Sequence, residues 1–355
     1  MRILVINCGS ATLKYALYET GGAQLERLAA STATWEGGHA ATLRRALAGL
    51  PAPPEAIAHR VVHGGERFVA PVAIDDDVLR HLAELVPLAP LHNALALEGI
   101  AATRDLGVPL LAVFDTAFFA DLPARARRYA VPEAPGVRRY GFHGWSHRSV
   151  TERAAALLGR AEPTLVSLHL GSGCSAVAIS RGKPVDVSMG YSPLEGLVMG
   201  TRPGDVDPGL LLHLVQQGMD AAGLERLLHR ESGLKALAGS ADMRELLARD
   251  DAAARDAVEI FCYRIVKYVG AYLAVLGGGM DALAFTGGIG SGSPEIRRRV
   301  CAALAWAGIA LDEPRNARGE GRISADGGRV AVLALASDEE GVIAAEAAGW
   351  FGRRN

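Results

Sequence analysis

Residues 3–17 have the sequence Ile-Leu-Val-Ile-Asn-Cys-Gly-Ser-Ala-Thr-Leu-Lys-Tyr-Ala-Leu, and this stretch decides the fold. An apolar run, a small polar turn and a second apolar run predict a β-hairpin. The same order returns in residues 165–179, Leu-Val-Ser-Leu-His-Leu-Gly-Ser-Gly-Cys-Ser-Ala-Val-Ala-Ile. Two similar hairpins about half a chain apart indicate duplicated halves, with a chance similarity of two hairpins as the alternative.

The segments between and after these hairpins alternate between strand-like and helical patterns. Residues 58–63 and 109–114 are short strand-like runs, and residues 74–85 have helical spacing. Between residues 256 and 276 apolar side chains recur every three or four positions, which predicts one long helix. Further elements are expected as a strand at 282–285, a helix capped by Ser293 and opened by Pro294, a strand at 330–336 and a C-terminal helix. This alternation predicts an α/β protein, and we place a domain boundary near residue 148.

The composition limits the class of protein. The 355 residues suggest two domains, and 37 basic against 39 acidic side chains give a formal net charge of −2. A nearly neutral chain is a poor match for a nucleic-acid-binding protein, which must neutralise phosphates. The four cysteines have no C-x-x-C spacing, which fits reduced thiols. Because the sequence has no secretory-signal pattern and no apolar run of membrane-spanning length, we expect a cytoplasmic protein with no membrane partner.

Three glycine-rich segments follow predicted strands. They are residues 7–12, Gly171-Ser-Gly173 and Gly287-Gly-Ile-Gly290. Backbone N–H groups at the strand ends of an α/β sheet are suited to phosphate binding. For residues 7–12 alone an ordinary hairpin turn is the better explanation, and any one glycine group is weak evidence. Three such segments in one chain indicate a polyphosphate ligand. The G-x-x-x-x-G-K-[ST] phosphate loop is absent, so a nucleotide enzyme with this sequence belongs to another lineage.

Several charged side chains lie at positions typical of catalytic, substrate-binding or metal-binding residues. Arg60 lies in the middle of a predicted strand, where an unpaired charge is costly to bury. Its partner is either a structural carboxylate such as Glu66 or an anionic substrate. Asp115 ends the next strand, a typical place for a metal ligand, a base or a positioning carboxylate, with helix capping as the alternative. Residues 338–340, Asp-Glu-Glu, either hold Mg²⁺ or favour a helix N-terminus.

Taken together, these segments resemble the acetate kinase family of short-chain carboxylate kinases, within the actin, sugar-kinase and Hsp70 fold group. The matching strings occur in the family's order; they are residues 4–10, 59–66, 89–93, 113–118, 139–144, 188–190, 193–202 and 285–290. The resemblance implies two duplicated actin-like (ribonuclease H-like) α/β domains with a cleft between them. Residues 1–148 would form the first domain and 149–337 the nucleotide-binding domain, with a helix at about 338–355 returning to the first.

The resemblance also implies a role for each matching residue. Those that resemble catalytic residues are Asp115, His143 and Arg202. The acyl substrate would be bound by Arg60, Val62, Leu91, Phe142 and Pro193. Mg²⁺, or Mn²⁺ in its place, would be held by Asn7 and Glu339. The nucleotide would be bound by Ser10, Thr12, Lys14, His169, Leu170, Gly171, Ser172, Gly173, Asp242, Met243, Arg244, Gly287, Gly288, Ile289, Gly290 and Ser291.

The activity implied by the resemblance is reversible, Mg²⁺-dependent phosphoryl transfer from ATP to acetate, giving acetyl phosphate and ADP, by a homodimer. Propionate would also fit, because one methylene changes binding by only about 1–3 kcal/mol. A carboxylate is already a nucleophile, so the protein's task is to bring two anions together. Two arginines, an imidazole and Mg²⁺ supply the positive field for this.

Several positions depart from the family's pattern. Ser172 replaces Asn, Ser291-Gly292 replaces Glu-Asn, and Asp338 replaces Asn. Trp145 stands where a Thr is usual and Phe119 where a His is usual. Because two of the first three changes lie in nucleotide segments, a donor other than ATP, such as pyrophosphate, stays open. A catalytically weak, nucleotide-binding regulatory protein of the same fold is the second alternative.

Overall fold

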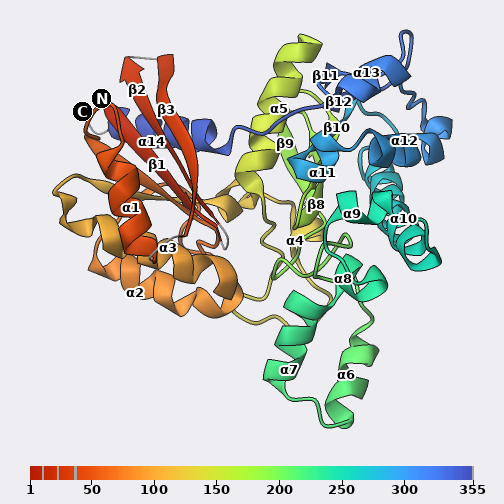
Figure 1. The fold of residues 1–355 in the computed structure, drawn as a ribbon, viewed down its shortest axis with the longest axis horizontal. Helices are drawn as coiled ribbons and strands as arrows, with labels where there is room; N and C mark the ends of the chain where they lie inside the picture. Colours follow the sequence, from red (N-terminus) through yellow and green to blue (C-terminus); the bar gives the residue numbers. More distant parts are fainter. Residues whose placement is uncertain (10–11, 22–23, 36–37, 354–355) are drawn as a thin grey trace. The chain divides into compact units, whose positions relative to one another are not determined.

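The computed structural model describes residues 1–9, 12–21, 24–35 and 38–353, without the side chains of residues 24, 40, 90 and 91. The chain forms two compact units, one of Met1–Ala120 with Asp338–Asn355 and one of Asp121–Ser337 (Figure 1). The division differs from the predicted boundary near residue 148. Its reason is local: Arg139 pairs with Glu195, and the Tyr140 N–H donates to the Gly190 carbonyl oxygen over 3.0 Å, so this segment belongs to the second unit.

The first unit is a six-stranded sheet with helices on its faces. Its strands are β1 (Arg2–Cys8), β2 (Thr12–Gly21), β3 (Gln24–Thr34), β4 (Ala56–Val61), β5 (Val72–Ala73) and β6 (Leu110–Phe114). Its helices are α1 (His39–Ala48), α2 (Asp76–Glu84), α3 (Pro90–Thr103) and α14 (Glu339–Gly352), with short 3₁₀ segments η1 (Val86–Leu88), η2 (Arg104–Leu106) and η3 (Asp115–Phe119).

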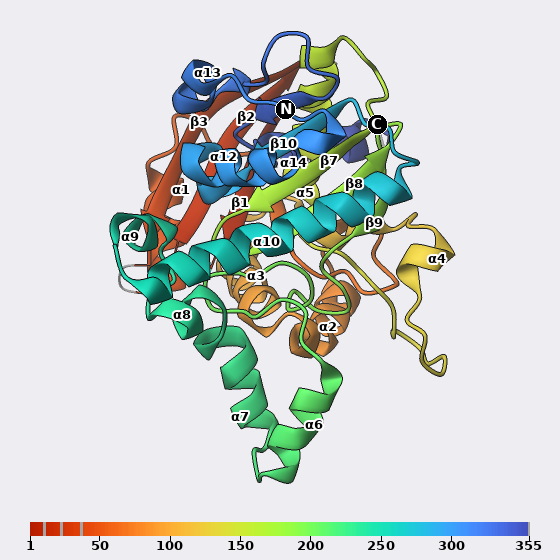
Figure 2. The same cartoon turned by 90° about the vertical axis from the view of Figure 1, so that its right-hand side faces the viewer.

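The second unit is also a six-stranded sheet with helices. Its strands are β7 (Leu165–Leu170), β8 (Cys174–Ser180), β9 (Lys183–Val187), β10 (Ala282–Thr286), β11 (Gly321–Arg322) and β12 (Ala331–Ala334). Its helices are α4 (Ala124–Arg127), α5 (Gly144–Leu158), α6 (Pro208–Gln216), α7 (Ala221–Arg226), α8 (Gly233–Ala238), α9 (Met243–Ala248), α10 (Ala252–Val275), α11 (Gly287–Gly292), α12 (Pro294–Ala303) and α13 (Glu313–Arg318), with short segments η4 (Leu227–Glu231) and η5 (Ala305–Ala307). Helix α10 runs across β7 and β8 (Figure 2).

The two sheets have the same topology. The order β3-β2-β1-β4-β6-β5 in the first corresponds to β9-β8-β7-β10-β12-β11 in the second. In each, two antiparallel pairings are followed by two parallel pairings and a short antiparallel edge strand. The predicted α/β class and the duplicated halves are therefore confirmed.

Strand alternation decides which side chains of the first unit reach which face. Successive residues of a strand point to opposite faces. Leu4, Ile6 and Cys8 of β1 pack in a core with Leu43 of α1 and Leu95 of α3. The alternate residues of β1 point to the other face, where α14 packs. By the same rule, alternate residues of β4 point towards α14. Each of the two strands places one polar side chain on that face, Asn7 of β1 and Arg60 of β4.

His59 lies on the α3 face of β4, where its side chain is buried. Burial lowers the pKa of His59 to about 3, and its Nε2 lies 2.9 Å from Thr103 Oγ1. In the unfolded chain the imidazole has its ordinary pKa of about 6.5. Between these two pH values the unfolded state binds more protons, so stability decreases by at most about 1.4 kcal/mol for each unit by which the pH drops.

We therefore expect the free energy of unfolding to fall as the pH drops below about 6.5, and the His59→Gln variant to have a shallower pH dependence. Urea unfolding at several pH values measures both slopes. His213→Gln, which changes an exposed histidine, should keep the wild-type slope. Equal slopes for wild type and His59→Gln would contradict the expectation.

Candidate functional site

Arg60 is held by a carboxylate of the protein. It lies on the α14 face of β4, and its Nε donates to Asp115 Oδ1 over 3.1 Å, while Nη2 contacts Asp115 Oδ2. Burial lowers the pKa of Arg60, but the carboxylates of Asp115 and Glu339 outweigh burial, so the net pKa lies above the ordinary value. The partner is thus Asp115 at the end of β6, not Glu66.

Asn7 connects Arg60 to α14. Its Oδ1 accepts from Arg60 Nη1 over 3.0 Å, and its Nδ2 donates to Glu340 Oε1 over 3.0 Å. Glu339 Oε2 lies 3.9 Å from Arg60 Nε. Asp338 caps α14 by accepting from the Gly341 N–H over 3.1 Å. The acidic run therefore begins a helix, as one of its two expected functions, and it places two carboxylates beside Asn7 and Arg60. Binding of Mg²⁺ stays a prediction.

The oxygen atoms of this cluster suit Mg²⁺ only in part. Carboxylate and amide oxygens are its usual ligands, and it commonly binds through one or two carboxylates, water and substrate phosphates. Within the described residues, no group of three His, Cys, Asp or Glu side chains is arranged to hold a metal ion. The cluster thus fits a cation that is also coordinated by the phosphate oxygens of a substrate. The described protein side chains alone do not complete its coordination shell.

In the second unit, His143 and Arg202 meet at Gly173. A Cβ added to Gly173 would lie 2.5 Å from Nη2 of Arg202 and 3.3 Å from Nε2 of His143. His143 precedes α5 with φ of 59°, in the left-handed region that few non-glycine residues adopt. Its ring stacks on His169 of β7 at 4.1 Å. A strained backbone, a stacked ring and a close glycine together fix this imidazole beside the guanidinium.

Arg202 is a half-buried cation of the second unit. It donates from Nη1 to the Pro193 carbonyl oxygen over 2.8 Å, and burial lowers its pKa. Among the residues that the structure describes, no carboxylate forms an ion pair with it. Leaving a half-buried charge unpaired is costly unless an anion binds there. Arg202 and His143 are therefore a candidate site for an anionic ligand, whereas Arg60 is already neutralised.

The space around Gly173 gives a direct test of this arrangement. We expect Gly173→Ala to lower kcat/KM by about 100-fold, because the methyl group displaces Arg202 and a shift of about 1 Å in a positioning group has effects of this size. Steady-state kinetics measures the loss. Gly270→Ala in α10, where the added methyl meets no atom within 4 Å, is the matched control and should keep wild-type kinetics. Normal activity of Gly173→Ala would show that Arg202 does not need this position.

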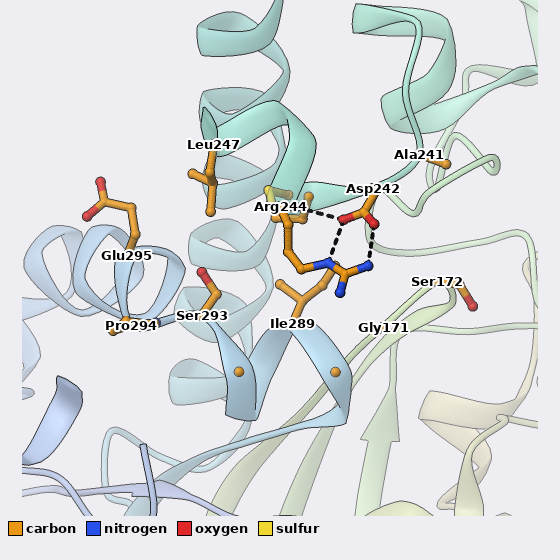
Figure 3. Close-up of a pocket in the computed structure, with 13 residues that line it drawn as sticks. Gly171, Ser172, Ala241, Asp242, Arg244, Leu247, Ile289, Ser293, Pro294 and Glu295 are labelled. Carbon is orange, nitrogen blue, oxygen red and sulfur yellow. Dashed lines mark hydrogen bonds and ion pairs between the residues drawn. The ribbon is translucent and has the colours of Figure 1, made fainter. Parts of the chain in front are cut away.

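Some of the predicted nucleotide-binding residues line one cavity of about 850 Å³ in the second unit (Figure 3). They come from the end of β7, from α9 and from α11, and include Gly171, Ser172, Asp242, Met243, Arg244, Gly288 and Ile289. Asp242 caps α9, and its carboxylate also receives the Arg244 side chain through Nε at 3.1 Å and Nη2 at 2.6 Å. Figure 3 places this pair opposite Ile289.

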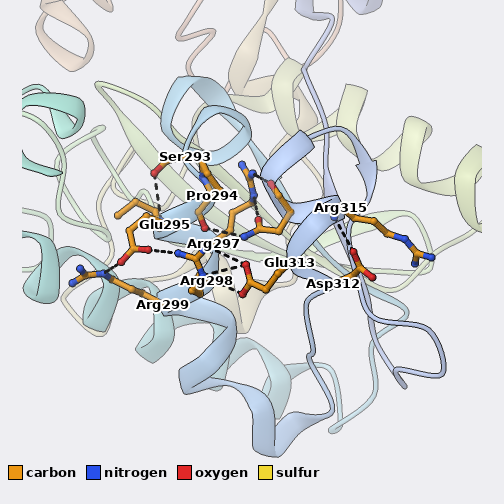
Figure 4. Close-up of polar contacts among 11 residues, drawn as sticks. Ser293, Pro294, Glu295, Arg297, Arg298, Arg299, Asp312, Glu313 and Arg315 are labelled. Atoms are coloured by element: carbon orange, nitrogen blue, oxygen red, sulfur yellow. Dashed lines mark hydrogen bonds and ion pairs between the residues drawn. The ribbon is translucent and has the colours of Figure 1, made fainter. Parts of the chain in front are cut away.

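The glycine-rich run after β10 is a helix, α11, where the sequence indicated only a turn. It begins at Gly287 with φ of +78°, where a Cβ would lie 2.5 Å from the Leu170 carbonyl oxygen. Buried Arg297 of α12 holds its other end, since Nη1 donates to the carbonyl oxygens of Gly290 and Ser291 over 2.8 and 2.7 Å. Its Nε donates to Asn316 Oδ1 over 2.8 Å, which ties α11 to α13 (Figure 4).

The remaining predicted residues are placed as follows. Val62 is buried in the first unit, and Phe142 and Pro193 are buried in the second. Thr12 begins β2, where its carbonyl oxygen accepts from the Gly9 N–H over 2.9 Å, and Lys14 is exposed on the same strand opposite Asn7. Ser10 and the side chain of Leu91 lie outside the described residues.

Sequence reasoning missed two polar residues beside His143. Ser175 and His147 both bond around its ring. The position of His147, four residues after His143, was a signal, because residues at this spacing lie on the same side of a helix. Ser175 had no signal beyond its neighbours in the chain. Glu340, which bonds to Asn7, was foreseen only as part of the acidic run 338–340.

Comparison with known proteins gives a consistent result. The model of the acetokinase family matches residues 45–345. The acetate kinase of Clavibacter michiganensis subsp. michiganensis is 44% identical over 383 residues, which cover 95% of this chain and 96% of that protein. A propionate kinase from Francisella tularensis subsp. tularensis has a solved structure with a TM-score of 0.88 and 35% identity, covering 97% of this chain and 98% of that one. The Porphyromonas gingivalis acetate kinase structure gives 0.86 and 37%, with 99% of both chains covered. This chain belongs to the acetokinase family, and it is a kinase whose phosphoryl acceptor is a carboxyl group.

Proposed function

We propose that the protein is an acetate kinase, which transfers the γ-phosphoryl group of ATP to acetate and forms acetyl phosphate and ADP reversibly. The observation that carries the proposal is the Arg202 guanidinium beside His143 at Gly173, which has no carboxylate partner in the described part of the chain. Phosphoryl transfer spreads negative charge over the equatorial oxygens of the moving group, and fixed N–H donors stabilise that charge. The acetate kinase named above, 44% identical, supports this choice of acceptor.

In the proposed reaction, a carboxylate oxygen of acetate attacks the γ-phosphorus, the bond from phosphorus to the β,γ-bridging oxygen breaks, and ADP leaves. Arg202 and His143 donate to the transferring phosphoryl group. Asp115 fixes the Arg60 guanidinium through a two-point contact, which leaves its Nη1 bonded to Asn7. Arg60 thus acts as an oriented and largely neutralised donor to the acyl substrate, and Asp115 as its positioning carboxylate.

Mg²⁺ would be held by Asn7 and Glu339, directly or through water, with Glu340 beside them. Bound there, the ion neutralises phosphate charge. Mn²⁺ has the same preference for oxygen ligands and is the proposed substitute.

The cavity in the second unit is the proposed site of the nucleotide. Its volume suits a nucleoside, and its lining combines apolar Leu247 and Ile289 with the Asp242–Arg244 pair. Serine and glycine at 172, 291 and 292 are smaller than the family's usual residues, so fewer side chains reach the donor. ATP remains the proposed donor because its nucleoside can contact the apolar walls of this large cavity, whereas pyrophosphate has no apolar group to place there.

The methyl group of acetate would pack against the side chains of Val62, Leu91, Phe142 and Pro193. Propionate is expected as a weaker or comparable substrate, since one methylene in an apolar pocket changes binding by about 1–3 kcal/mol. The likeness to a propionate kinase of known structure supports testing propionate as a substrate.

A homodimer and a cytoplasmic location also stay predictions of the resemblance. Within the described residues, the structure has no helix of the length and apolar character needed to cross a membrane.

A matrix of donors and acceptors tests the proposal. Purified protein is incubated with Mg²⁺, one donor (ATP, GTP or pyrophosphate) and one acceptor (acetate, propionate or none), and hydroxylamine traps any acyl phosphate as the hydroxamate. We expect the largest signal with ATP and acetate and none without an acceptor. Folded protein that gives no hydroxamate with any donor would disprove the proposal, and turnover with pyrophosphate but not ATP would replace the donor.

A further inference from the structure

A chain of hydrogen-bonding side chains connects His143 to the interior of the second unit. Nδ1 of His143 lies 2.9 Å from Ser175 Oγ, and the same oxygen lies 2.7 Å from Nε2 of His147. Nδ1 of His147 lies 2.8 Å from Ser167 Oγ. The fold explains the alignment. Ser175 is paired across the sheet with His169 on the face that α5 covers, and His143 and His147 are four residues apart at the start of α5.

The number of protons in this chain limits its arrangements. The single hydroxyl proton of Ser175 lies between two imidazole nitrogens, so at least one of these nitrogens carries a hydrogen. His147 is fully buried, and burial, together with His169, lowers its pKa well below the ordinary value. His147 is therefore neutral and has one ring proton, on either Nδ1 or Nε2.

The two possible positions of the His147 ring proton place the proton of neutral His143 on different nitrogens. With the proton of His147 on Nδ1, Ser175 donates to His147 and accepts from Nδ1 of His143, so a neutral His143 has a bare Nε2. With the proton of His147 on Nε2, Ser167 donates to His147, His147 donates to Ser175, and Ser175 donates to Nδ1 of His143. A neutral His143 then carries its proton on Nε2.

We propose that Ser175 and His147 are positioning residues that hold the proton of neutral His143 on Nε2, the nitrogen next to Arg202 at Gly173. The inference rests on the proposed function, because it assigns this N–H to the transferring phosphoryl group. A bare nitrogen lone pair there would repel a phosphoryl oxygen, whereas an N–H donates to it. The arrangement keeps His143 a donor without requiring a second positive charge beside Arg202.

The contacts also fix the direction of the ring. Stacking on His169 sets the plane of the His143 ring, and the bond from Ser175 sets its rotation within that plane. His169 is itself bonded to Ser146, whose Oγ lies 2.7 Å from Nδ1. The chain through Ser175 is thus the part of this cluster that decides the position of a proton on His143.

The kinetic test compares three variants of the full chain. Ser175→Ala removes the hydroxyl and should lower kcat by about 100-fold or more, with little change in either KM, since a wrong imidazole tautomer costs about 10⁴-fold in a serine protease. Ser175→Thr keeps a hydroxyl and should restore most of the activity. Thr151→Val is the matched control: it removes another buried hydroxyl of α5 that bonds to the His147 carbonyl oxygen, not to a ring, and should keep wild-type kcat.

The spectroscopic test needs no turnover. Imidazole ¹⁵N NMR of protein with labelled histidine, at about pH 8.5 with ADP, Mg²⁺ and acetate, reports which ring nitrogen of His143 carries hydrogen, since an ordinary imidazole is neutral there. The His143 signals are assigned by their loss in His143→Gln. We expect hydrogen on Nε2 in the wild type and a mixture in Ser175→Ala.

Hydrogen on Nδ1 in the wild type would overturn the inference, and so would wild-type kcat in Ser175→Ala. If no substrate gives an acyl phosphate, the proposed function fails, whereas the NMR result still stands. The two failures are therefore distinguishable.

Discussion

Arg202→Ala is expected to lower kcat for acetyl phosphate formation by about 10³-fold or more while the protein stays folded. A guanidinium that stabilises the charge of a transferring phosphoryl group contributes about 10³–10⁵ in rate. The structure gives Arg202 a carbonyl partner but, among the described residues, no carboxylate, so its removal breaks no ion pair. Urea unfolding should show little change, and steady-state kinetics should show the loss.

Two further variants sharpen this result. Arg202→Lys keeps the charge but loses the planar donor set, so it should recover only part of the rate. Arg104→Ala, which breaks an exposed pair with Asp76, is the control for removing an arginine and should keep wild-type kinetics. Near-normal kcat in Arg202→Ala would refute the role given to the guanidinium.

Asp115→Asn is expected to damage both stability and activity. Asp115 is buried and makes a two-point contact with Arg60, so the variant leaves a poorly compensated cation inside the first unit. Removing one member of a buried pair destabilises proteins by about 3–5 kcal/mol, which urea unfolding measures. The freed Arg60 also loses its orientation towards the acyl substrate, so kcat/KM for acetate should fall sharply.

A double variant separates the two effects. Replacing Arg60 and Asp115 together by leucine removes both charges, so it should regain much of the stability lost in Asp115→Asn and none of the activity. Asp77→Asn, which breaks the exposed pair with Arg67, is the control and should change neither property. Wild-type stability of Asp115→Asn would contradict the buried pairing.

The sequence did not show that Arg60 pairs with a carboxylate whereas Arg202, among the described residues, does not. The strand pattern around Arg60 correctly predicted a charge at the middle of a strand, but its partner lies 55 residues away. Parallel pairing of β4 with β6 brings the two together, and such register is not encoded locally. A nearby residue, Glu66, was therefore the natural but wrong candidate.

The regular elements were predictable where burial sets the periodicity. The hairpins of β1 with β2 and of β7 with β8, helix α10 and the Ser293 cap all follow from apolar spacing and capping residues. Strand β3 was missed because its sequence mixes polar and small residues. Helix α11 was missed because glycine favours turns, whereas here Arg297, from the following helix, holds its last carbonyl groups.

The candidate site was predictable mainly through resemblance. Motif order identified Asn7, Arg60, Asp115, His143 and Arg202, and the structure groups the first three around one ion pair and the last two around Gly173. The Ser167, His147 and Ser175 chain could not be predicted, because it exists only after β7 and β8 pair and α5 covers them.

The most direct test of the central claim follows an oxygen atom. Acetate labelled with ¹⁸O in both carboxylate positions is incubated with the protein, ATP and Mg²⁺, and the product is examined by ³¹P NMR. Attack by a carboxylate oxygen on the γ-phosphorus predicts acetyl phosphate with ¹⁸O in the bridge to phosphorus, formed in equal amount to ADP. Release of unlabelled inorganic phosphate without any labelled acetyl phosphate would contradict the account.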